Sequence, residues 1–195
     1  SRNVTIGYEA GKYMTAALDA VVIGFMAHHE SDATDVVVIG SSAGYNNAGN
    51  NNNFIGTQAG MTNTTGAQNI FIGNFSGFDN STTSDNIFIG HTAGRYAIGT
   101  ANVAMGKEAG FGVTGNIYNS GVLIGHQAGK ALTTGDNSLM LGYQAGTSVT
   151  SGDNNILLGY QAGDSITTGA GNIVVGYGQD TSAPAASNEL NIGGV

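Results

Sequence analysis

The chain has 195 residues, of which 33 are glycine, one is proline and none is cysteine, and its formal net charge at pH 7 is −8. Without cysteine, the chain can form neither a disulfide nor a thiolate metal site. The negative charge argues against a nucleic-acid partner and against an anionic membrane surface, because both demand a basic face. The longest apolar run, 20–27, is too short to cross a bilayer, so we expect no membrane insertion.

One motif returns from end to end: a short apolar stretch, a glycine, and an Ala-Gly pair beginning three residues later, as in residues 156–163. The first glycines of the copies, called here the glycine column, are Gly7, Gly24, Gly40, Gly56, Gly73, Gly90, Gly106, Gly125, Gly142, Gly159, Gly176 and Gly193. So short and regular a period predicts a solenoid, in which each unit buries its apolar face only by stacking on its neighbours. We therefore predict an all-β, parallel β-solenoid (β-roll) of about twelve coils of 16–19 residues. We expect it to form a single domain over residues 1–195.

The residues just before each glycine predict a β-strand, in which successive side chains point to opposite faces. The residues one and three places before the glycine, called here the flanking columns, are nearly all large and apolar, and we expect them to fill the inside of the coil. The residue between them, called here the middle column, should then point outward.

Ten of the twelve residues in the middle column are apolar, which is too large a stripe to leave in water and predicts an interface between copies. The predicted interface residues are Val22, Val38, Phe54, Phe71, Phe88, Leu123, Met140, Leu157 and Val174. The simplest arrangement is a parallel homotrimer with this stripe on its axis, and a dimer is the alternative.

Two other features of the repeat suggest local structure. Asn recurs four places before the glycine, for example at Asn69 and Asn86, and stacked Asn side chains can form a hydrogen-bonded ladder. Thr-Thr-Gly segments such as 133–135 predict a short second strand that ends in a turn.

The repeat is irregular in three places: near 27–35, at 111–120, and over the atypical C-terminal end, 177–195. Interruptions in solenoids map to loops, which often carry function. The candidate receptor contacts are therefore His28, His29, Phe111 and Tyr118. Tyr143 and Tyr160 join them from the residue after the glycine, called here the ring column, because that column holds several rings. These rings are either a structural stack or an aromatic surface for sugars, with Gln144 and Gln161 as neighbouring hydrogen-bonding groups.

Several chemical motifs have simpler explanations. The segment 40–44 matches the Gly-x-Ser-x-Gly nucleophile elbow, but the repeat accounts for its glycines, so we interpret Ser42 as a coincidence. His28, His29, Glu30 and Asp32 offer metal-ligand chemistry, but neighbouring histidines point apart and no second pair supplies the remaining ligands, so we interpret this segment as a solvated loop. The scattered acidic residues do not suggest the carboxylate pair of a glycosidase. We predict no catalytic residue, cofactor or metal, and no enzymatic activity.

The repeat Asn-Ile-x-Ile-Gly-Tyr-Gln-Ala-Gly followed by Thr-Thr-Gly resembles repeats of bacteriophage tail fibres, and is similar to the head repeats of trimeric autotransporter adhesins. Those heads are left-handed parallel β-rolls that assemble as trimers, and the resemblance implies the same arrangement here. The ending 186–193 resembles the stretch that precedes the chaperone domain of tail fibres and tailspikes.

These features predict a structural and host-attachment segment of a phage tail fibre, located in the virion and outside the cell. Its expected partners are copies of itself, other tail-fibre or virion proteins, and a glycan of the host surface. The alternative is a bacterial surface adhesin or extracellular fibre of the same architecture. A tailspike depolymerase and an ice-binding solenoid are weaker alternatives, the latter because several coils lack the threonines that it needs.

Overall fold

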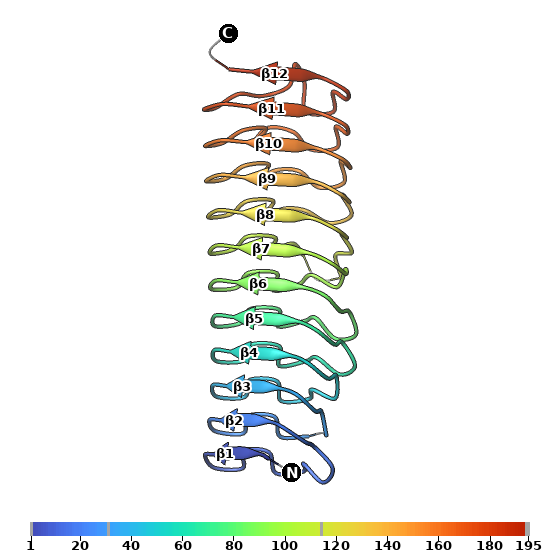
Figure 1. Ribbon diagram of the computed structural model, residues 1–195. Coiled ribbons are helices and arrows are strands. Elements are labelled where there is room, and N and C mark those ends of the chain that lie inside the picture. The colour runs from blue at the N-terminus through green and yellow to red at the C-terminus, as the bar shows by residue number, and fades with distance from the viewer. Residues whose placement is uncertain (1, 31, 114, 194–195) are drawn as a thin grey trace.

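The computed structural model is a rod made of stacked coils, each contributing one short strand to a single parallel sheet (Figure 1). It describes residues 2–30, 32–113 and 115–193. The twelve strands are β1 (Val4–Ile6), β2 (Val21–Ile23), β3 (Val37–Ile39), β4 (Asn53–Ile55), β5 (Ile70–Ile72), β6 (Ile87–Ile89), β7 (Val103–Met105), β8 (Val122–Ile124), β9 (Leu139–Leu141), β10 (Ile156–Leu158), β11 (Ile173–Val175) and β12 (Leu190–Ile192). The sheet order follows the chain from β1 to β12, so the predicted β-solenoid is confirmed.

Every strand pairs in register with the equivalent strand of the next coil, as Phe54 pairs with Phe71 and Phe71 with Phe88. At about 4.8 Å between neighbouring strands, the stack is about 55 Å long. The predicted second strand is wrong: the Thr-Thr-Gly segments 64–66, 133–135 and 167–169 are bends without strand structure. They still stack through backbone bonds, since the Thr133 N–H donates to the Thr150 carbonyl at 2.7 Å.

The glycine column forms the corner at which the chain leaves each strand. At Gly90 the backbone has φ = +135°, a conformation that side chains disfavour, and a Cβ there would lie 2.6 Å from the carbonyl oxygen of Gly106 in the next coil. A positive φ and the close approach of another backbone therefore both require glycine at this corner.

The predicted Asn ladder is confirmed. The Asn69 N–H donates to Asn52 Oδ1 at 2.8 Å, and the Asn86 N–H donates to Asn69 Oδ1 at 3.0 Å. Each side-chain amide also donates to a carbonyl of a turn, as Asn52 Nδ2 does to the Gly66 oxygen at 2.7 Å. Because these side chains are fully buried, the ladder satisfies backbone groups that water cannot reach.

The middle column lies inside the coil, and the expectation that it points outward is wrong. From Val22 to Val174 its side chains are all 0% exposed, including each residue of the predicted interface, namely Val22, Val38, Phe54, Phe71, Phe88, Leu123, Met140, Leu157 and Val174. The Phe54, Phe71 and Phe88 rings stack in the core with centroids 4.9 and 5.1 Å apart. The two flanking columns do share one face, as expected, but that face is on the outside.

The cores of the coils that begin with β5, β6, β9 and β10 exchange large and small residues. Coils with Phe71 or Phe88 in the middle column carry buried Asn80 or Ala97 seven places after the glycine. Coils with the narrower Met140 or Leu157 carry the larger buried residues Val149 or Ile166 at that place. Close packing of protein interiors explains this reciprocity, since a void or an overlap in any coil is costly.

The irregular segments lie mostly within the described residues. Of the segments 27–35, 111–120 and 177–195, positions 31, 114 and 194–195 lie outside the described residues. The 111–120 segment lengthens its coil and adds an isolated parallel bridge between Ala97 and Asn116. Within the described residues no helix is long or apolar enough to span a lipid bilayer.

Candidate functional site

Two adjacent surfaces of the rod carry the features that bear on function: the outer side of the strands and the ring column beside it. The outer strand face consists of the flanking columns, and it is apolar at every strand except for Asn53 in β4. The exposed fraction of its side chains is 45% at Leu141, 39% at Ile173 and 58% at Ile6, and in the central coils they are mostly half-buried by their neighbours along the sheet. No flanking-column position carries a charge.

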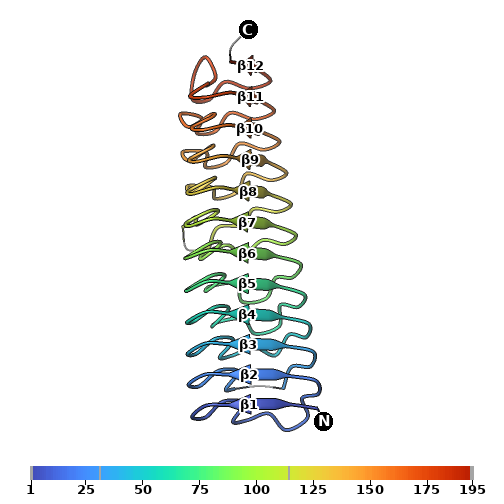
Figure 2. The ribbon, with the colours of Figure 1, turned by 60° about the vertical axis from the view of Figure 1, so that its left-hand side comes forward.

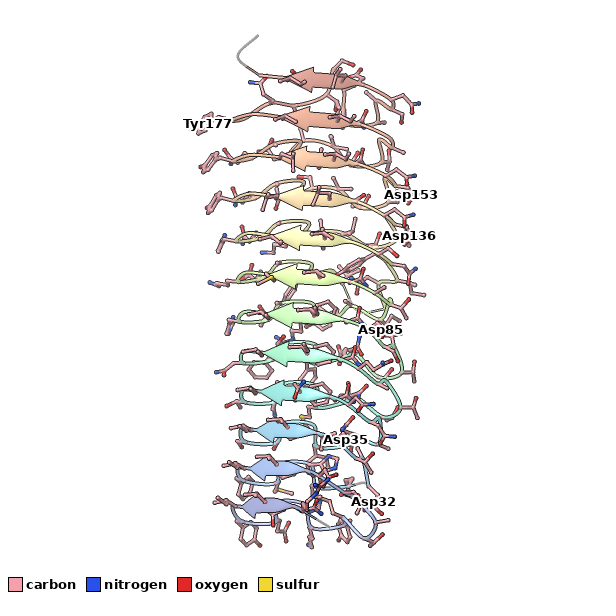
Figure 3. All side chains as sticks on the ribbon, in the orientation of Figure 1. Asp32, Asp35, Asp85, Asp136, Asp153 and Tyr177 are labelled. Atoms are coloured by element: carbon pink, nitrogen blue, oxygen red, sulfur yellow. The ribbon has the colours of Figure 1, made fainter. Side chains whose placement is uncertain are left out.

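The ring column forms two stacks along the edge that follows the strands. Tyr8 stacks on Phe25 near the first coils, with ring centroids 5.6 Å apart. His126, Tyr143, Tyr160 and Tyr177 form the second stack, with successive centroids 5.1, 5.0 and 4.9 Å apart. Figure 3 shows Tyr177 projecting beyond the carboxyl ends of the strands, on the edge opposite Asp136 and Asp153.

The stacking limits what these rings can contact. Tyr143 and Tyr160 are 43% and 40% exposed, but each lies between two other rings, so both of its faces are covered. The accessible part is therefore the ring edge with its hydroxyl, which donates and accepts hydrogen bonds. Tyr177 is more open, at 77% exposed.

A ladder of amides runs beside the second stack. Gln161 Nε2 donates to Gln144 Oε1 at 3.0 Å, Gln144 Nε2 donates to Gln127 Oε1 at 2.8 Å, and Gln127 Nε2 donates to Glu108 at 2.8 Å. Lys130 pairs with Glu108 at 2.7 Å. The hydrogen bond from Lys130, followed by that from Gln127, lowers the pKa of Glu108 to about 2. Gln144 and Gln161 are thus engaged with one another, so a ligand would meet a preformed amide row.

The two histidines predicted as receptor contacts are buried. His28 takes the place of the second glycine of the motif, with φ = +46°, and its ring is 0% exposed in a coil whose middle-column residue is only Val22. Burial lowers the pKa of His28, against smaller opposite effects of the Gly44 backbone and the Asp32 carboxylate. His28 is therefore not accessible to a receptor, and the prediction that it is a receptor contact is wrong. Its imidazole fills space that the small Val22 leaves in the core of this coil.

His29 is also covered, at 4% exposed, and it belongs to a network that ties the first three coils together. Its Nε2 lies 3.1 Å from Glu9 and its Nδ1 lies 3.0 Å from Glu30. The Tyr45 hydroxyl donates to Glu30 at 3.0 Å, and the Tyr45 ring stacks on His29 with centroids 4.9 Å apart. The solvated-loop interpretation is therefore wrong for His28 and His29, whose surroundings are those of structural residues.

The residues predicted from the 111–120 segment have different positions. Tyr118 is 0% exposed, burial raises its pKa, and its hydroxyl donates to the Gly110 carbonyl at 3.1 Å. It fills the coil that has Ala104 in the middle column, so the receptor contact expected there is wrong. Phe111 remains half-exposed, with its ring edge-on to Tyr96 at 5.0 Å and Lys130 6.0 Å above it.

The motif at Ser42 follows the ordinary geometry of the repeat. Ser42 has φ = +52°, as Gln58 has +55° and Gln144 has +55° at the same position of other coils. Within the described residues no pocket is formed, and no three histidine or acidic side chains come together as metal ligands.

The sequence analysis identified the flanking columns but predicted that they lie inside the coil, so it missed the outer strand face. The missed signal is the reciprocal size change between the middle column and the buried residue seven places after the glycine. Only residues that share one core need to compensate one another in volume. No model of a known protein family matches this sequence, and none of the curated proteins compared with it is significantly similar.

Proposed function

We propose that this chain is a rod segment of a bacteriophage tail fibre, which gives the fibre reach and presents side-chain rows for attachment to a host surface. The observation that carries the proposal is the uniform stack of coils, in which each strand contacts only its neighbours in sequence (Figure 2). Such a solenoid extends in one dimension and keeps its surface rows parallel to its axis. The likeness of the repeat to tail-fibre repeats supports the same function.

The surface best suited to a glycan is the row formed by Tyr143, Tyr160 and Tyr177. Their hydroxyls repeat at about the strand spacing, and amphipathic rings suit surfaces that contact polar ligands. Each contact alone is weak, but several on one rigid rod, and several rods in one fibre, raise the avidity when the host glycan is dense. In the assembly that the resemblance implies, three copies and other virion proteins complete the fibre.

The test is binding of the fluorescently labelled protein to a panel of bacterial strains, before and after removal of surface polysaccharide. Binding that disappears with the polysaccharide is the expected result. A variant with Tyr143→Phe, Tyr160→Phe and Tyr177→Phe keeps the ring stack and removes its hydroxyls, and it should bind at least several-fold more weakly. Tyr8→Phe in the separate N-terminal stack is the matched control and should bind like the unaltered protein. Equal binding by the triple variant would refute the tyrosine row as the glycan contact.

A further inference from the structure

The outer strand face is an apolar surface that a single chain leaves in contact with water. It comprises two residues from each of the twelve strands, and Asn53 is the one polar member. The two columns are about 7 Å apart and the stack is about 55 Å long, so with side-chain width the face covers about 700 Å². Monomeric proteins rarely expose a contiguous apolar patch of more than a few hundred Å².

The size of this face matches what a stable protein interface needs. A standard interface buries about 800 Å² on each partner, and its centre is depleted of charged residues. The outer strand face is close to that size and carries no charge along its whole length. Two copies of a chain with net charge −8 can therefore approach through this face without placing like charges against each other.

The periodicity of the face identifies its partner. Side-chain rows repeat at the strand spacing of about 4.8 Å over all twelve coils. Sheets that pack face to face interdigitate their side chains at a separation of about 10 Å. A partner without this repeat matches the rows over a few coils only, whereas another copy of the same chain matches them throughout.

We propose that the outer strand face is a self-association surface, whose partner is the outer strand face of another copy of this chain. The middle column then packs inside each coil, and the flanking columns pack between copies of the chain. This inference goes beyond the fibre function, because it holds whatever the fibre binds. It also replaces the interface predicted from the middle column, whose residues are enclosed in their own coil.

Sedimentation velocity tests the proposal on the whole chain. The unaltered protein should sediment as a dimer or trimer at tens of micromolar, since either assembly removes the face from water. The variant with Ile72→Asp and Ile89→Asp should sediment as a monomer with an unchanged far-UV circular dichroism spectrum. The control with Thr65→Asp and Ser151→Asp adds the same charge at exposed turn positions and should remain assembled. A monomeric unaltered protein, or an assembled Ile72→Asp, Ile89→Asp variant, overturns the proposal.

A cysteine test keeps the proposal falsifiable even if the charged variant fails to fold. The chain has no cysteine of its own. Ile89→Cys, at mid-length on the face, should form a disulfide-linked pair on mild oxidation, and Ser151→Cys should form much less. Equal cross-linking of the two variants overturns the proposal. A monomeric rod that still binds bacteria refutes self-association alone, and an assembled rod that binds no strain refutes the attachment function alone.

Discussion

The middle column and the flanking columns lie one residue apart on the same strands, and both are apolar, yet their surroundings are opposite. Phe71 is 0% exposed inside the coil, whereas its neighbours Ile70 and Ile72 lie on the outer strand face. The middle column varies from Ala104 to Phe88, because each of its residues must fit the rest of its own coil. The flanking columns keep to Val, Ile, Leu and Met with one Asn, because within one chain they pair only with their equivalents in the coils above and below. Variation in residue size, more than polarity, therefore distinguishes the buried middle column from the flanking columns.

The largest expected loss of stability comes from a charge placed in the buried middle column. Phe71→Asp places a carboxylate in the core and removes a stacked ring, which should lower the free energy of unfolding by about 4 kcal/mol or more. Ile72→Asp, one residue further along, should change the free energy of unfolding by about 1 kcal/mol or less. Thermal unfolding followed by circular dichroism, at a concentration that dissociates any assembly, measures both variants. Similar losses in the two variants would contradict the assignment of inside and outside.

The corner beside the strand should be the next most sensitive feature. Gly90→Ala forces a side chain into φ = +135° and against the Gly106 backbone, and should cost several kcal/mol. Gly178→Ala is the matched control: it also has a positive φ, +57°, but a Cβ there meets nothing within 4 Å. Its cost should be about 1 kcal/mol, from backbone strain alone. If denaturant unfolding gives equal costs, the contact between neighbouring coils does not constrain the corner.

A double-mutant cycle at Phe88 and Ala97 tests whether the two residues compensate each other in size within one core. Phe88→Leu should destabilise the coil by leaving a void, and Ala97→Leu should destabilise it by overpacking. The double variant reproduces the combination found at Leu123 and Leu132, so it should recover about 1 kcal/mol relative to the sum of the single changes. A cycle of Ala97→Leu with Ile89→Val, on the outer face, should show a coupling near zero. Strong coupling in that second cycle would mean that the two columns share one packing environment.

The smallest expected effect is the response of the enclosed histidine to acid. Burial lowers the pKa of His28 below its ordinary value of 6.5, so the imidazole stays neutral in the folded chain when it is already protonated in the unfolded chain. Stability should therefore be constant above about pH 6.5 and fall as the pH drops toward the lowered pKa.

His28→Gly restores the residue that other coils have at this corner and removes the titrating group. The variant should lose that part of the pH dependence, although the void that it leaves lowers stability at every pH. Urea unfolding midpoints measured between pH 8 and 5 give the comparison. An undiminished acid slope in the variant would assign the titration to another group, such as Glu9, whose pKa the hydrogen bond from Lys12 lowers.

The sequence by itself determined the solenoid, the number of its coils, the register of the sheet and the Asn ladder. A repeat with an unbroken glycine column allows only equivalent positions to stack, so aligned copies become paired strands, as Phe54 pairs with Phe71. Alternation along a strand also showed that Ile70 and Ile72 share a face opposite that of Phe71. It did not show which of the two faces is enclosed, because polarity is the usual indicator and both faces are apolar.

The tertiary structure alone decided the direction in which the chain turns at each glycine. That direction determines that the middle column, and not the flanking columns, lies inside the coil. The tertiary structure also buries His28 and Tyr118 completely, in the coils that begin with the strands of Val22 and Ala104. In the sequence both residues look like interruptions suited to binding, because a residue that breaks a repeat pattern resembles a functional one. Their complete burial shows instead that they belong to the cores of coils whose middle-column residues are small, which is a property of three-dimensional packing and not of the chain read one position at a time.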